Sequence, residues 1–132
     1  MNDDLVELVR SALRKNGCDE RLLNNFDGNS TICLDFEEES SLLISQTEGY
    51  VVLWTQLQPH DPYILSQCAS ALLALVMAPC FHAVTGHLQL SENEGMTTLE
   101  CYVKPASLNA EDFSEALEEF YRQMKAFREA LR

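Results

Sequence analysis

The chain has 132 residues and a mass of 14.9 kDa, so we expect a single domain over residues 1–132. Hydrophobic residues make up 46% of it, which is enough apolar material for a packed core and excludes global disorder. Lys and Arg total 9 against 21 Asp and Glu, and the net charge of −12 disfavours nucleic acids and anionic membranes as partners.

Nothing in the sequence predicts a membrane span or an export signal. The longest apolar stretch, Cys68 to Phe81, is shorter than the ~20 residues that cross a bilayer. The start, Met1 to Asp4, is acidic, whereas a signal peptide begins with basic residues. The five cysteines are odd in number and contain no CxxC pair, which favours reduced thiols. We therefore expect a cytoplasmic protein.

Residues 4–15 are predicted to form an amphipathic helix. Apolar side chains recur there at the i, i+3, i+4, i+7 and i+8 positions of one helical face, and Gly17 stands just past the end. The apolar residues of this face are Leu5, Leu8, Val9, Ala12 and Leu13. Residues 16–29 are rich in Asn, Asp and Gly and are expected to form a connecting loop.

Three strands are predicted next, in an antiparallel meander. They span Ser30 to Phe36, Ser41 to Thr47 and Tyr50 to Leu57, where β-branched and aromatic residues gather. The acidic turn Glu37–Glu39 separates the first two strands, and Glu48–Gly49 forms a short hairpin turn between the second and third.

A second helix is predicted from Pro62 to about Ala78. Asp61 caps its start, Pro62 suits the first helical position, and Pro79 ends it. This helix is apolar nearly all round, and one sheet can cover only one side of it. We therefore expect a homodimer in which small residues let the partner backbone approach closely. These small residues are Ala71, Ala74 and Ala78.

Two further strands are predicted over Ala83 to Ser91 and Met96 to Lys104, joined by the turn Glu92–Gly95. Asn109 then caps a final helix whose apolar residues alternate at intervals of four and three. They are Phe113, Leu117, Phe120, Met124, Phe127 and Leu131. The predicted fold is α+β in the order α-β-β-β-α-β-β-α, an antiparallel sheet packed by three helices, in a homodimer.

The sequence offers little sign of catalysis. The glycines are scattered and none is followed by lysine, which argues against a phosphate-binding loop. Cys80, His82 and His87, with Cys101, are the best metal-ligand cluster, but their spacing fits no standard zinc pattern. We expect no catalytic residues, no metal and no cofactor. A small enzyme or ligand-binding protein with a pocket near Cys80, His82 and His87 remains an alternative.

Apolar surface is the feature that could bind a partner. Around Trp54, in the run Val51 to Thr55, apolar side chains fall on both faces of the strand. Trp54 therefore belongs either to the core or dimer interface, or to an open groove. The helix over residues 4–15 likewise either seals the sheet or lines a cleft beside an edge strand that could accept an extended peptide. The residues alone predict an acidic dimeric binding module.

The sequence resembles the class IB type III secretion chaperones of the InvB/SpaK kind, over roughly residues 4 to 131. The segments that carry the resemblance are Leu5 to Leu13, Gly17-Cys18, Asp27 with Ser30-Thr31-Ile32, Val52 to Leu57, and Phe120-Tyr121. The resemblance implies a cytoplasmic bacterial homodimer that uses no ATP. It would bind the N-terminal chaperone-binding segment of type III effectors in extended form, keep them stable and secretion-competent, and present them to the export machinery, including its ATPase.

The resemblance also suggests where the partners bind. We expect the effector cleft on Leu5, Leu8, Val9, Ile32, Leu34, Phe36, Ile44 and Trp54. We expect the dimer contact on Ile64, Gln67, Ala71, Ala74, Leu75 and Ala78. A dimeric adaptor that binds a folded regulatory protein is a second alternative to the chaperone.

Overall fold

The computed structural model describes residues 3–17, 23–24, 31–36 and 41–132, so the predicted acidic turn Glu37–Glu39 lies outside the described residues. The elements of the first half are α1 (Asp3–Lys15), β1 (Leu23–Asn24), β2 (Thr31–Leu34), β3 (Leu42–Thr47) and β4 (Tyr50–Pro59). Those of the second half are α2 (Pro62–Gln67), α3 (Ala69–Met77), β5 (Gln89–Asn93), β6 (Met96–Val103), the 3-10 turn η2 (Pro105–Ser107) and α4 (Ala110–Ala130).

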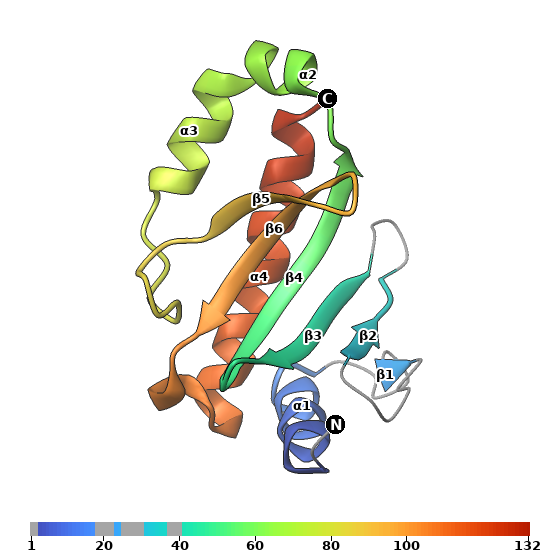
Figure 1. Cartoon of the computed structure of the whole chain (residues 1–132). Helices are drawn as coiled ribbons and strands as arrows, with labels where there is room; N and C mark the ends of the chain where they lie inside the picture. Colours follow the sequence, from blue (N-terminus) through green and yellow to red (C-terminus); the bar gives the residue numbers. More distant parts are fainter. Residues whose placement is uncertain (1–2, 18–22, 25–30, 37–40) are drawn as a thin grey trace.

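The strands form one antiparallel sheet in the order β1-β2-β3-β4-β6-β5 (Figure 1). The predicted α+β fold with an antiparallel sheet is therefore confirmed. The sheet has six strands where five were expected, because the two residues of β1, in the predicted loop, pair with the outer edge of β2.

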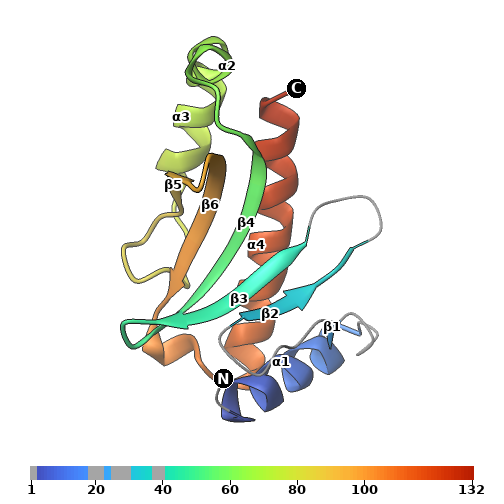
Figure 2. The ribbon, with the colours of Figure 1, turned by 45° about the vertical axis from the view of Figure 1, so that its right-hand side comes forward.

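One face of the sheet carries the hydrophobic core. Strand residues alternate between the faces, and Ile44 of β3, Leu53 of β4 and Cys101 of β6 lie opposite one another on the core side. Helix α4 runs along this face, and α1 packs against α4 at the end of the sheet that holds β2 and β3 (Figure 2). The sheet and these two helices thus enclose the core in two layers.

Helix α4 forms as predicted. The Asn109 side chain accepts a hydrogen bond from the Asp112 backbone N–H at 2.9 Å and caps the first turn. The predicted apolar seam faces the sheet, and Phe113, Met124 and Phe127 are fully buried in it. This seam is the largest block of aromatic side chains in the core.

The second predicted helix is divided. Asp61 caps α2 through the Tyr63 N–H at 2.9 Å, but regular helix stops at Gln67 and resumes as α3 at Ala69. Cys68 between them has a ψ of 6°, which is outside the helical range. Ser and Cys have lower helix propensity than Ala or Leu, and beyond the break α3 contacts α4.

The prediction of a strand from Ala83 was wrong for residues 83–88. Gly86 has a φ of +82°, a left-handed conformation that interrupts an extended strand. The segment is instead attached to β6 by an isolated bridge between Ala83 and Val103 and by a 2.7 Å hydrogen bond from the Val84 N–H to the Tyr102 carbonyl. Regular pairing begins only at Gln89, in β5.

Within the described part of the chain, no helix is both long enough and apolar enough to cross a membrane.

Candidate functional site

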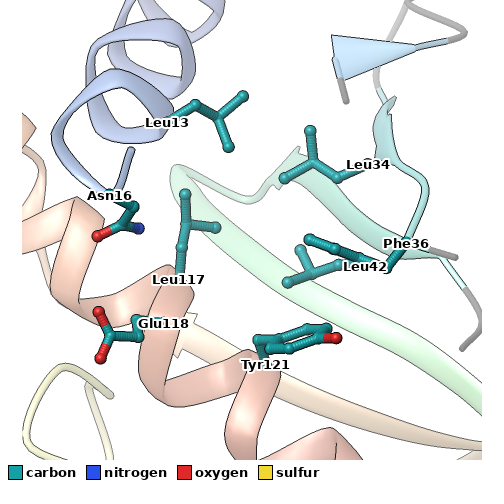
Figure 3. A pocket seen from close by; sticks show the side chains of 8 residues that line it. All are labelled: Leu13, Asn16, Leu34, Phe36, Leu42, Leu117, Glu118 and Tyr121. Atoms are coloured by element: carbon teal, nitrogen blue, oxygen red, sulfur yellow. The ribbon is translucent and has the colours of Figure 1, made fainter. Parts of the chain in front are cut away.

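A partly enclosed apolar pocket of about 300 Å³ lies between α1, the β2–β3 pair and α4 (Figure 3). Its lining side chains are Leu13, Asn16, Leu34, Phe36, Leu42, Leu117, Glu118 and Tyr121. We call it the α1–α4 pocket. Its volume is at the lower end of the range for ligand sites, so it suits one or two side chains of a larger partner.

The pairing of β2 with β3 positions the side chains at the base of the α1–α4 pocket. Leu34 of β2 lies opposite Leu42 of β3, so both side chains point to the same face of the sheet. Leu13 reaches the pocket from the last turn of α1, and Leu117 reaches it from α4 (Figure 3). The pocket is thus lined by residues from α1 near the start of the chain and from α4 near its end.

An aromatic pair closes one side of the α1–α4 pocket. The rings of Phe36, just after β2, and Tyr121, on α4, lie 4.5 Å apart between centroids at an angle of 41°. Both side chains are half-buried, and the Lys125 ammonium lies 5.2 Å from the Tyr121 ring centroid. The pair connects the edge of the sheet to α4 and forms an apolar wall that faces solvent.

Asn16 and Glu118 are polar residues that line the pocket, and their side chains have different hydrogen-bond partners. Asn16 donates to the Ser114 carbonyl at 3.1 Å and accepts from the Ser114 hydroxyl at 2.9 Å, so its amide is occupied in joining α1 to α4. Glu118 lies at the rim with 60% of its side chain exposed, and it accepts from Arg122 at 2.9 Å. The pocket is therefore apolar inside, with a carboxylate at its mouth.

Two of the predicted effector-binding residues, Leu34 and Phe36, line the α1–α4 pocket. Leu5 and Leu8 line a separate hollow of about 410 Å³ along α1, which also includes Gln46. Sequence reasoning had placed all four in one cleft. In the structure they line two separate hollows.

The remaining predicted cleft residues lie elsewhere. Val9, Ile32 and Ile44 have 0% exposure and belong to the core. Trp54 is half-buried on the opposite face of the sheet, where its indole N–H donates to Ser45 Oγ at 3.0 Å. The structure does not bring Trp54 together with Leu34 and Phe36.

Sequence reasoning did not assign Leu42, Leu117 or Tyr121 to the site, and it left open whether Leu13 seals the sheet or lines a cleft. Leu13 and Leu117 were recognised as members of apolar helical faces, which predict burial but not which gap the side chain borders. Tyr121 was among the residues that carried the family resemblance. That resemblance was the one signal in the sequence that pointed to this part of α4.

The surface of α2 and α3 exposes large apolar side chains. Tyr63, Leu73 and Met77 have 69%, 58% and 66% of their surface exposed. Leu72 is the only described side chain of α3 that is buried. Among the predicted dimer residues, Gln67, Ala71 and Ala74 are exposed, whereas Ile64, Leu75 and Ala78 are half-buried.

The residues considered for metal binding take separate roles. Cys80 is buried and donates to Glu119 Oε1 at 3.2 Å, and His82 Nδ1 lies 2.8 Å from Ser107 Oγ. His87 is exposed. In the described ranges, no three His, Cys, Asp or Glu side chains come together in a group that could hold a metal ion.

Comparison with known proteins identifies the family. A model of the Invasion protein B family matches residues 17–94. The surface presentation of antigens protein SpaK of Salmonella typhimurium is 40% identical over 129 residues, which cover 97% of this chain and 96% of SpaK. The chain belongs to the Invasion protein B family. The resemblance to type III secretion chaperones is thereby confirmed, and so is the expectation that the chain is not an enzyme.

Solved structures share the fold of this Invasion protein B family member. A chain of the HopA1-SchA chaperone-effector complex aligns with a TM-score of 0.61 at 16% identity, over 96% of this chain and 94% of that one. A chain of the heterodimeric ExoU-SpcU complex, from the type III secretion system of Pseudomonas aeruginosa, aligns with a TM-score of 0.59 at 14% identity, over 93% of both chains. The α+β fold described above is therefore shared with chains of both complexes.

Proposed function

We propose that this chain is an ATP-independent cytoplasmic chaperone that binds the N-terminal chaperone-binding segment of type III effectors in extended form. It keeps the effectors stable and secretion-competent, and it presents them to the export apparatus, including the export ATPase. The observation that carries the proposal is the α1–α4 pocket, an apolar hollow with a solvent-facing aromatic wall. Membership of the Invasion protein B family supports it.

The size of the α1–α4 pocket favours an extended ligand. Full burial of one large apolar side chain contributes about 1.5–3 kcal/mol, whereas micromolar affinity requires about 8 kcal/mol. One pocket of about 300 Å³ therefore holds only a part of the binding segment. A segment that runs on across the surface can add further anchors, for example in the hollow beside Leu5 and Leu8. An extended chain can make such separate contacts at once.

We further propose that the chaperone is a homodimer joined through α2 and α3. The exposed Tyr63, Leu73 and Met77 would otherwise leave large apolar side chains in water. Ala71 and Ala74, which are also exposed, allow two backbones to approach closely. A twofold contact would bury this surface on both copies together with the predicted dimer residues.

Native mass spectrometry of the tagged chain, purified from its own host with the secretion apparatus expressed, tests the proposal. We expect a complex that contains twice the 14.9 kDa chain and one secreted protein. A bare monomer, or a species that carries a small ligand and no protein, would contradict it. If the captured partner's bound segment already resists protease before binding, the partner is folded there and the adaptor alternative is correct.

A further inference from the structure

We propose that the segment held in the α1–α4 pocket carries a lysine or arginine next to its apolar anchor, and that the acidic face of α4 beside the pocket selects for it. This inference rests on the proposed function and specifies the chemistry of the partner at that site.

A second, polar hollow adjoins the α1–α4 pocket. It has a volume of about 310 Å³ and is lined by Phe81, His82, Glu115, Glu118, Glu119 and Arg122. Glu118 lines both hollows, so the apolar pocket and the polar hollow lie on either side of one residue of α4. A partner segment that leaves the pocket across α4 enters the polar hollow directly.

The charges of the polar hollow favour a cation. It contains three carboxylates, and Arg122, the one arginine that lines it, already pairs with Glu118 at 2.9 Å. Glu115 is 61% exposed, with Oε1 3.5 Å from His82 Nε2. An arriving ammonium or guanidinium group therefore meets an excess of negative charge, whereas an arriving carboxylate is repelled.

Two further basic groups lie near the polar hollow but do not line it. The Lys104 ammonium stacks on the Phe81 ring, 3.5 Å from its centroid, and does not line the polar hollow. Lys125 lies over the Tyr121 ring, on the following turn of α4. Along α4 the three carboxylates of the polar hollow all precede Arg122 and Lys125, so the partner's cation fits beside these glutamates.

Two labelled synthetic peptides test the inference. Both contain several leucines in an extended sequence, so that more than one hollow can be occupied, and the central leucine is flanked by lysines in one and by glutamates in the other. Because exposed ion pairs each strengthen binding by up to about fivefold, we expect the lysine peptide to bind about fivefold to tenfold more tightly at low salt. High salt should remove most of this preference.

Matched variants locate the effect. Glu118→Gln should lower the preference for the lysine peptide about threefold, since it removes a rim carboxylate and leaves Arg122 unpaired. Glu129→Gln is the control, because Glu129 is also exposed on α4 and pairs with Arg132 at 3.2 Å, away from both hollows. It should leave the preference unchanged.

The outcomes separate this inference from the proposed function. Equal binding of both peptides, weakened about tenfold by Phe36→Ala, would overturn the charge selection and leave the pocket's role intact. Equal effects of Glu118→Gln and Glu129→Gln would show that only net charge matters, and would also overturn it. Failure of both peptides to bind would contradict the proposed use of the pocket and the inference together.

Discussion

Replacing Phe36 by alanine should weaken effector binding more than it weakens the fold. The Phe36 ring is half-buried and contacts Tyr121 at 4.5 Å, so it forms a wall of the pocket without filling the core. A fully buried Phe→Ala change costs about 3–5 kcal/mol, and half of that, about 2 kcal/mol, is expected here for unfolding. Loss of the wall should reduce effector affinity about tenfold.

Two measurements and one control variant separate these effects. Urea unfolding can be followed through Trp54, the single tryptophan, which lies on the opposite face of the sheet. Effector affinity can be measured by titration calorimetry with the secreted partner. Tyr50→Ala is the control, because Tyr50 also belongs to an aromatic pair, with Tyr102 at 6.0 Å, but does not line the pocket. Affinity of the Phe36→Ala protein within twofold of wild type would refute the role of the pocket.

Three further predictions follow from the packing. Met77→Asp should convert the proposed dimer to a folded monomer, as measured by light scattering and circular dichroism, because Met77 is 66% exposed on α3. A dimer that persists would exclude this face. Cys101 should resist alkylation in the native protein while half-buried Cys68 reacts, because the hydrogen bond with Cys80 and burial raise the pKa of the Cys101 thiol. Mass spectrometry can map the labelled thiols, and labelling of both at equal rates would be inconsistent with this prediction. His82→Ala should lower the free energy of unfolding, measured in urea, by about 1–3 kcal/mol, because it leaves the buried Ser107 hydroxyl unpaired. An unchanged urea midpoint would show that the His82–Ser107 hydrogen bond does not stabilise the fold.

The elements with a long, regular apolar pattern could be predicted from the sequence. The seam of α4 and the stripe of α1 each repeat over several turns, and local capping at Asn109 agrees with them. The breaks could not be predicted as well. Cys68 lies inside the apolar run of the second predicted helix and Gly86 lies before β5, and each changes the backbone at a single residue.

The candidate site was only partly predictable, for a physical reason. Leu13, Leu42 and Tyr121 are far apart in sequence and meet only through the sheet order and the packing of α1 on α4. Alternation along β2 and β3 predicted that Ile32, Leu34 and Ile44 share a face. It could not show that Leu34 borders a pocket while the other two are sealed in the core.

The central claim is that a secreted partner occupies the α1–α4 pocket. Photo-crosslinking in the host tests it most directly, with a benzophenone amino acid placed at position 121, on the pocket wall, or at position 50, away from it. We expect position 121 to capture the N-terminal segment of a secreted protein and position 50 to capture none. Equal capture at both positions, or none at position 121, would contradict the account.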